Sequence, residues 1–289
     1  MDRRTALKMG LISSPVVLTA GLHAASPQKS KSYTIEKPTR FLHSISRWCY
    51  SKVEIEELIS WCKELGIASI ELLDKEEYDI VKAAGLDCAI VNGSSLGLQK
   101  GFCNPIYHNQ LFEDYSNLIP QMANDGLKTI ITFSGNRVGI SDERGLGNCV
   151  KGLRPIVELA AKHNVMVVME LLNSLVDHND YMCDKTEWGV ALVDAVGMDN
   201  FRLLYDIYHM QIMEGNVVAN IRKYHSYFAH YHTGGVPGRH EINENQELNY
   251  SFIMKSIAET GYSGYIGQEF IPTRENSYDS LKEAISICS

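Results

Sequence analysis

Apolar and polar positions alternate along this chain in two different periods. Short apolar runs that suit buried strands are followed by stretches in which apolar residues recur every three or four positions, as on amphipathic helices. The predicted strands are FLHSISRW (41–48), SIELLD (69–74), LDCAIVNG (86–93), KTIITFSG (128–135), VMVVMELLN (165–173), RLLYDIYH (202–209), FAHYHTG (228–234) and YIGQEFIP (265–272). The predicted helices include VEIEELISWCKELG, EEYDIVKAAG, a helix ending in PIVELAAKHN, TEWGVALVDAVG, VVANIRKYH and NYSFIMKSIAETG.

Eight strand–helix repeats favour one fold. Parallel strands that are apolar on both faces must be covered by helices on both sides, and eight such units close into a barrel. The 289 residues of the chain are close to the roughly 250 residues typical of this architecture. A doubly wound open sheet is the alternative, but no glycine-rich phosphate-binding loop follows the first predicted strand. We therefore expect an α/β fold, a single (β/α)8 TIM barrel over residues 41–289.

The first forty residues do not follow the barrel pattern. Arg3 and Arg4 precede a modest apolar stretch and then small residues, which is typical of a twin-arginine export signal. A membrane anchor is the alternative, but the stretch is interrupted by Gly, Ser and Pro and falls short of the ~20 apolar residues of a stable span. We expect residues 1–25 to be a removable signal peptide, residues 26–40 to be a polar linker, and the protein to be periplasmic.

Composition narrows the class of partner. The formal net charge is −8, and Lys and Arg are scattered, so the chain lacks the basic face that nucleic acid requires. The seven cysteines are odd in number and contain no CxxC pair, which predicts buried thiols rather than a disulfide framework. A small-molecule substrate is the expected partner, and the sequence is also compatible with a homo-oligomer.

Four residues with metal-binding side chains stand at the downstream ends of four successive apolar runs. They are Glu170, Asp206, His232 and Glu269. An ionised group at the end of a buried strand costs several kcal/mol unless a partner or a metal compensates it. In a barrel these strand ends meet at the C-terminal mouth, where the chemistry of the fold takes place. A shared divalent cation is the simplest common explanation.

Each of these residues also has a structural interpretation. Glu170 could pair with an Arg of a neighbouring strand, and Asp206 could cap the next helix. Strand alternation places His230 and His232 on one face, with His232 closer to the mouth. Arg239 follows a tight Gly–Pro loop, where it could hold a carboxylate or hydroxyl of a substrate or pair with Glu241.

Three carboxylates and one imidazole form an oxygen-rich donor set. Such a set suits Mn²⁺, Mg²⁺ or Co²⁺ better than a thiolate-type zinc site, with Zn²⁺ as an alternative. Coordination positions left open by the protein would accept a vicinal carbonyl and hydroxyl, which acidifies the C–H bond next to the carbonyl. A carboxylate could then move that proton. The predicted reaction is isomerisation or epimerisation next to a carbonyl.

The second half of the chain resembles a known family. The segment from MELLNS to YDIYHMQ, followed by HYHTGGVPGRHE and YIGQEF, is similar to the hydroxypyruvate isomerase-like branch of the xylose isomerase-like barrel superfamily. The likeness covers most of the chain from about Phe41 onward. It implies that the four strand-end residues bind the metal and that Glu170 and Glu269 double as an acid–base pair. It also implies that His209 and Arg239 touch the substrate, a sugar or a hydroxy-keto acid.

Several related activities stay open. A ketose 3-epimerase, or a dehydratase acting on a keto-sugar or inosose, would use the same metal and the same proton abstraction. An endonuclease IV-like role would need a His-rich multi-zinc site and a basic groove, which the acidic charge disfavours. A sugar-binding module without catalysis is disfavoured because both candidate proton carriers are present. No phosphate-binding loop is visible, so a substrate without phosphate is expected.

Overall fold

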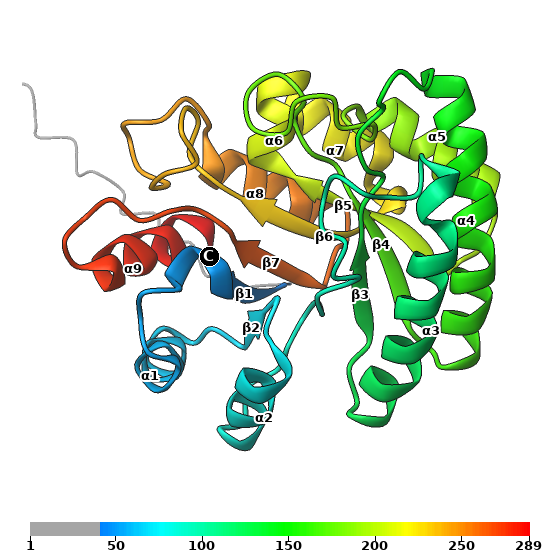
Figure 1. Ribbon diagram of the computed structural model, residues 1–289. Coiled ribbons are helices and arrows are strands. Elements are labelled where there is room, and N and C mark those ends of the chain that lie inside the picture. The colour runs from blue at the N-terminus through cyan, green and yellow to red at the C-terminus, as the bar shows by residue number, and fades with distance from the viewer. Residues whose placement is uncertain (1–40) are drawn as a thin grey trace, which may run out of the picture. The chain divides into compact units, whose positions relative to one another are not determined.

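The computed structural model describes residues 41–289, which belong to one compact unit (Figure 1). The export signal expected at residues 1–25 and the linker expected at residues 26–40 lie outside the described residues. None of the helices within residues 41–289 combines the length and the apolar character of a membrane span. Six of the seven cysteines are buried, as expected, and Cys49 is partly exposed.

A curled parallel sheet forms the centre of the fold. Its strands are β1 (Leu42–Ser46), β2 (Ser69–Glu71), β3 (Thr129–Thr132), β4 (Met166–Glu170), β5 (Phe201–Asp206), β6 (Phe228–Thr233) and β7 (Tyr265–Gln268). Neighbouring strands are parallel throughout, in the order β2-β1-β7-β6-β5-β4-β3. The expected TIM barrel architecture is confirmed.

The gap between β2 and β3 is filled by an irregular segment instead of the eighth regular strand expected at 86–93. Asp87 makes a parallel bridge to Ser69 of β2, and Val91 makes one to Ile130 of β3. Between these bridges the Ser69 hydroxyl accepts a hydrogen bond from the Ala89 amide at 2.8 Å, in place of a backbone carbonyl. The segment therefore occupies the position of a strand without a continuous backbone ladder.

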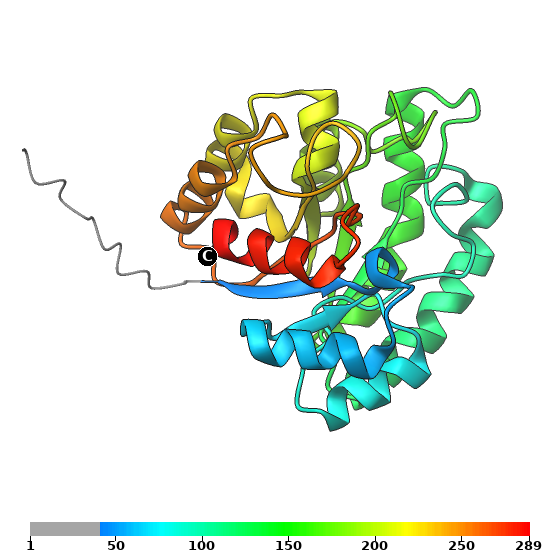
Figure 2. The same ribbon diagram turned by 90° about the vertical axis from the view of Figure 1, so that its left-hand side faces the viewer.

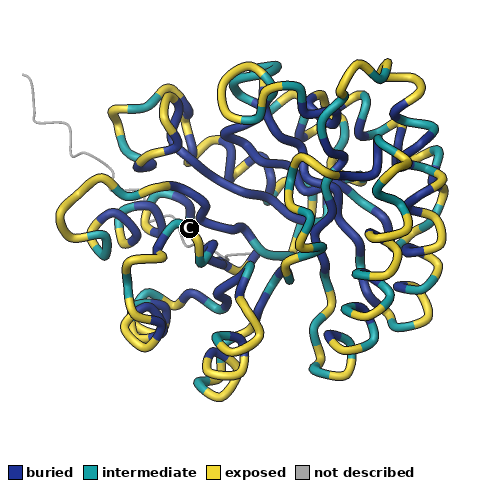
Figure 3. The backbone as a smooth tube through the Cα atoms, viewed as in Figure 1, coloured by how far each residue is buried: buried dark blue, intermediate teal, exposed yellow. Residues whose placement is uncertain are grey.

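Helices cover the outside of the sheet (Figures 1 and 2). They are α1 (Ile55–Leu65), α2 (Lys75–Ala83), α3 (His108–Asn124), α4 (Asp142–Lys162), α5 (Thr186–Val196), α6 (Ile207–Met213), α7 (Val217–Tyr224), α8 (Tyr250–Glu259) and α9 (Ser277–Cys288). Short 3-10 helices lie at Arg47–Tyr50, Pro105–Tyr107 and His225–Tyr227. The strands are buried, and the helices expose their outer faces (Figure 3). This layering is what amphipathic helices on an apolar sheet require.

Strand alternation places the site residues inside the barrel. Val168 and Leu204 belong to a small buried cluster that also contains side chains from β3 and from the irregular segment. Residues two positions apart on a strand point to the same face. Glu170 and Asp206 therefore point the same way as Val168 and Leu204, one layer closer to the C-terminal mouth.

Candidate metal centre and active site

The four strand-end residues meet at the C-terminal mouth of the barrel. Glu170 and Asp206 are the last residues of β4 and β5, His232 lies near the end of β6, and Glu269 directly follows β7. All four are buried, and one ligand atom from each lies within 4.8 Å of the others. The structure thus brings together every residue that the sequence predicts as a metal ligand.

The distances inside this cluster suit a single ion. His232 Nδ1 lies 2.8 Å from Glu269 Oε2, 3.2 Å from Glu170 Oε1 and 4.0 Å from Asp206 Oδ2. Ligand atoms about 2.1 Å from one ion and at right angles to each other are about 3 Å apart. Three carboxylates and an imidazole also have the donor chemistry of a hard divalent cation. The residues present therefore fit the expected metal.

The far nitrogen of His232 contacts a carboxylate that the sequence analysis did not identify. His232 Nε2 donates to Glu71 Oε1 at 2.8 Å, and Glu71 is fully buried at the end of β2. His230 Nε2 lies 3.2 Å from the other oxygen of Glu71. A carboxylate behind a metal-ligating imidazole fixes the ring orientation and the position of its proton. Glu71 therefore leaves Nδ1 of His232 facing the other carboxylates.

Arg239 enters the same cluster. Its Nη2 donates to Asp206 Oδ2 at 2.7 Å and to Glu269 Oε2, and its Nη1 donates to His209 Nε2 at 2.6 Å. Glu241 is not its partner, because the Glu241 carboxylate accepts instead from a distant loop and from α9. The structure therefore places Arg239 and His209 beside the predicted metal ligands.

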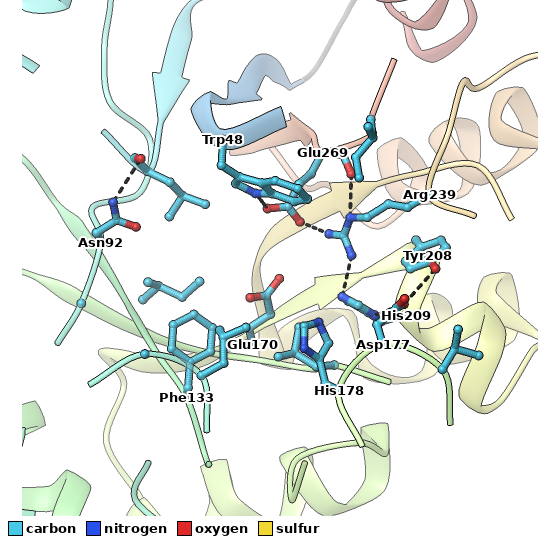
Figure 4. Close-up of a pocket in the computed structure, with 18 of the residues that line it drawn as sticks. Trp48, Asn92, Phe133, Glu170, Asp177, His178, Tyr208, His209, Arg239 and Glu269 are labelled. Carbon is cyan, nitrogen blue, oxygen red and sulfur yellow. Dashed lines mark hydrogen bonds and ion pairs between the residues drawn. The ribbon is translucent and has the colours of Figure 1, made fainter. Parts of the chain in front are cut away.

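Aromatic rings fix the Arg239 side chain. Its guanidinium carbon lies 5.5 Å from the Trp48 ring centroid and 5.0 Å from that of Tyr208, distances typical of cation–π contacts. Trp48 Nε1 also donates to Glu269 Oε1 at 2.7 Å. The Arg239 backbone has a φ of 59°, a conformation that costs energy for a residue other than glycine and is concentrated at functional sites. Figure 4 shows Arg239 between Trp48, Glu269 and His209.

The structure contains the helix cap suggested for Asp206 but not the arginine ion pair suggested for Glu170. Asp206 Oδ1 accepts from the His209 amide at 3.1 Å and so caps α6, while Oδ2 faces the cluster. The cap therefore leaves Oδ2 of Asp206 available as a candidate metal ligand. Glu170 contacts His232. Among the described residues no arginine forms an ion pair with Glu170.

Burial and mutual repulsion shift the acidities in this cluster. Burial raises the pKa of Glu170 to about 7 and that of Asp206 to about 6. Burial opposes a charge on His232 as well, but Glu269, Glu170 and Glu71 around it raise its pKa well above the usual value. Burial raises the pKa of Glu269 too, yet His232 and Arg239 outweigh it and hold that pKa well below the usual value. Without metal, positively charged His232 and Arg239 compensate the carboxylates.

These shifts predict a pH-dependent metal affinity. Protons compete with the ion for Glu170, whose pKa is raised to about 7, so lowering the pH from 8 to 6 should weaken binding. One such proton costs about tenfold in affinity over this range, and the raised pKa of His232 acts in the same direction. Calorimetric titration of the metal-free protein with Mn²⁺ at pH 6, 7 and 8 checks the expectation. An affinity that stays constant or rises at pH 6 would contradict it.

A cavity of about 940 Å³ opens onto the cluster. Glu170, Glu269, Arg239 and His209 line one part of it, and His178 lies beside His209 with ring centroids 5.1 Å apart. Burial lowers the pKa of both histidines, so both rings are uncharged near neutral pH. The remainder of the lining is mostly apolar, with Asp74, Asn92, Ser94, Ser95 and Asp177 among the apolar side chains. The two candidate proton carriers, Glu170 and Glu269, are therefore reached from a ligand-sized cavity.

A family model described as xylose isomerase-like TIM barrel matches residues 59–287. The chain belongs to this family. It is 30% identical over 134 residues to the hydroxypyruvate isomerase of Escherichia coli K12, covering 46% of this chain and 51% of that protein. It is 34% identical over 113 residues to the 2-oxo-tetronate isomerase of Cupriavidus necator, covering 39% and 43%. The matches thus span about half the length of these relatives.

Among solved structures, the fold is similar to a 3-keto-D-glucoside 4-epimerase from Escherichia coli. The TM-score is 0.70 at 18% identity, and the match covers 85% of this chain and 98% of that one. At this level of identity the likeness establishes the fold alone.

Proposed function

We propose that this protein is a metal-dependent isomerase or epimerase that moves a proton next to the carbonyl of a small hydroxy-carbonyl compound or sugar. The proposal rests mainly on one observation. Two carboxylates, Glu170 and Glu269, flank the same imidazole and both line the open cavity. The names of the two isomerases that match parts of the chain support the same reaction class.

Glu170, Asp206, His232 and Glu269 would hold the ion. Bound there, a divalent cation supplies positive charge that polarises the substrate carbonyl and stabilises the negative charge that develops beside it. Mn²⁺, Mg²⁺ and Co²⁺ match the oxygen-rich donor set best, and Zn²⁺ is the alternative.

The two glutamates would carry the proton. One carboxylate removes the proton from the carbon next to the carbonyl. The other returns a proton either to the carbonyl carbon, with the hydroxyl proton passing to the former carbonyl oxygen, or to the opposite face of the same carbon. The first outcome is an isomerisation and the second an epimerisation. No oxidant and no leaving group are needed, because the substrate and the product differ only in the position of hydrogen.

Arg239 and His209 would orient the substrate. Arg239 presents fixed donors at the edge of the cavity, and its ion pairs with Asp206 and Glu269 keep the guanidinium in place. Both ring nitrogens of His209 are engaged, Nε2 by Arg239 at 2.6 Å and Nδ1 by Asn173 at 2.7 Å. His209 would therefore hold Arg239 in place and contact the substrate through its ring carbons.

The reaction class can be tested directly with one screen. Hydroxypyruvate and a panel of keto-sugars are incubated with the Mn²⁺-loaded protein in D₂O, and NMR follows deuterium entering the carbon next to the carbonyl. Exchange with an isomeric or epimeric product supports the proposal. A product that has lost water would identify a dehydratase, which shares the proton-abstraction step. Absence of exchange with every compound would refute the proposed function.

We also propose that residues 1–25 direct export to the periplasm, because Arg3 and Arg4 precede a short, weakly apolar stretch. Replacing both by Lys should retain the protein in the cytoplasm of a bacterium with a twin-arginine translocase. Cell fractionation and immunoblotting measure the distribution, and Arg40→Lys in the predicted linker is the matched control. Unchanged periplasmic delivery of the double variant would refute the signal.

A further inference from the structure

His230 is a buried imidazole to which the proposed reaction gives no role. It is 3% exposed and lies two positions before His232 on the same face of β6. Its Nε2 lies 3.2 Å from Oε2 of Glu71, and neither atom has another polar partner among residues 41–289. Buried polar atoms are costly unless a partner compensates them, so this isolated pair requires an explanation.

The Glu71 side chain crosses two strands to reach these histidines. It starts at the end of β2, and the sheet order places β1 and β7 between β2 and β6. Both intervening strands carry small residues along its path. Ser46 of β1 donates to Glu71 Oε1 at 3.2 Å. A methyl group on Gly267 of β7 would lie 2.4 Å from the same oxygen and 2.7 Å from Cδ2 of His232. The carboxylate therefore has space here because position 267 is glycine.

The two oxygens of Glu71 have different partners. Oε1 accepts from His232 Nε2 at 2.8 Å and from Ser46, whereas Oε2 faces His230 alone. The last side-chain torsion of a glutamate has broad preferences, so contacts at one oxygen leave the plane of the carboxylate free to turn. A contact at the second oxygen restricts this rotation. The His230 ring also meets the His232 ring edge to face, with centroids 5.1 Å apart.

We propose that His230 is a positioning residue of the metal centre: it fixes the plane of the Glu71 carboxylate, which in turn orients His232 so that Nδ1 faces Glu170 and Glu269. The inference rests on the proposed function, because it concerns the site that would hold the ion. Outer partners that orient a ligating imidazole increase metal affinity. The alternative is that His230 only fills space inside the barrel, where any ring of similar size would serve.

Metal binding tests the proposal without catalysis. His230→Phe keeps a ring of similar size beside His232 but offers no N–H to Glu71. Calorimetric titration of the metal-free full chain with Mn²⁺ at pH 8 should show affinity about tenfold weaker, the lower end of the usual effect of losing an outer partner. His230→Gln offers an amide N–H and should restore most of the affinity. Tyr231→Phe, at the next position of β6, removes a hydroxyl without a hydrogen-bond partner in the described chain; it is the matched control and should bind like the parent.

A double-mutant cycle shows whether His230 acts through Glu71. If it does, adding His230→Phe to Glu71→Ala should weaken binding by less than about twofold, because the carboxylate that His230 fixes is already gone. Gly267→Ala, which displaces the same carboxylate, should weaken binding at least as much as His230→Phe does. His230→Leu gives the same comparison if the phenyl variant does not fold.

The outcomes separate this inference from the proposed function. Unchanged affinity in His230→Phe, an equal loss with and without Glu71, or no recovery in His230→Gln would overturn the positioning role while the metal centre stands. A parent chain that binds no Mn²⁺ would refute the metal centre and this inference together. If the cycle behaves as expected but no compound exchanges its proton in D₂O, the proposed reaction is refuted and the positioning role of His230 is retained.

Discussion

Glu170→Gln and Glu269→Gln should each lower the rate of the chemical step by about 10²–10⁴-fold, the usual contribution of a general acid or base. Both carboxylates lie beside His232 Nδ1 and reach the cavity, so each is in position to exchange a proton with a substrate. A glutamine amide has a similar shape and keeps an oxygen that can bind a metal, but it cannot take up the proton. The rate of deuterium exchange next to the carbonyl, measured at saturating substrate and Mn²⁺, reports this step.

Further measurements distinguish loss of the acid–base group from loss of bound metal. Because both residues are also candidate metal ligands, the bound metal is quantified for each variant, and the rate loss should exceed any loss of metal occupancy. Glu244→Gln, at an exposed position, is the matched control and should keep full activity. With substrate deuterated next to the carbonyl, the label should appear in water. Label that migrates intact to the neighbouring carbon would establish a hydride shift and refute the acid–base roles.

The positions of the candidate ligands could be predicted because two simple rules apply to them. An acidic or imidazole residue at the end of a buried apolar run needs a compensating partner, and parallel strands in a barrel bring their carboxyl ends to one mouth. Both rules use only local sequence and the strand–helix period. Glu170, Asp206 and Glu269 are clear cases, since each is a buried acidic residue at the end of a strand or directly after it.

Glu71 is also a buried acidic residue at the end of a strand, but the sequence pattern does not identify it. It lies inside the predicted run SIELLD, but β2 consists of only three residues, SIE, and Ile70 is the single apolar residue among them. The end of the strand is therefore invisible in the pattern of apolar residues. The contact of Glu71 with His232, which lies 161 positions away, depends on barrel closure and has no local signal.

Other missed features also depend on tertiary structure. Trp48 ends the first apolar run, but its hydrogen bond to Glu269 joins the two ends of the chain. The helix α3 contains Pro120, which weakens its sequence pattern, although Leu111, Tyr115 and Ile119 keep helical spacing and are buried. The sequence offers Arg239 two partners, a substrate group or Glu241. Its ion pairs with Asp206 and Glu269 have no local signal, because these residues lie 33 and 30 positions away.

Glu71→Ala should weaken metal binding by about 10–100-fold, the usual effect of losing the partner behind a ligating imidazole. Without Glu71, the Nε2–H of His232 loses its acceptor, so neither the ring orientation nor the proton position is fixed. Glu71→Gln keeps an oxygen that can accept this hydrogen bond and should restore part of the affinity. Calorimetric titration with Mn²⁺ at pH 8 measures all three proteins.

A general loss of stability must be distinguished from loss of this contact, because Glu71 is fully buried. Glu214→Ala is the matched control: its carboxylate accepts hydrogen bonds of 2.8 and 2.6 Å from the amide and hydroxyl of Thr186 at the start of α5, outside the cluster. This variant should unfold more easily than the parent and bind Mn²⁺ equally well. If Glu71→Ala weakened binding no more than Glu214→Ala, or if Glu71→Gln restored nothing, Glu71 would have a structural role only and His232 would be oriented by its other neighbours.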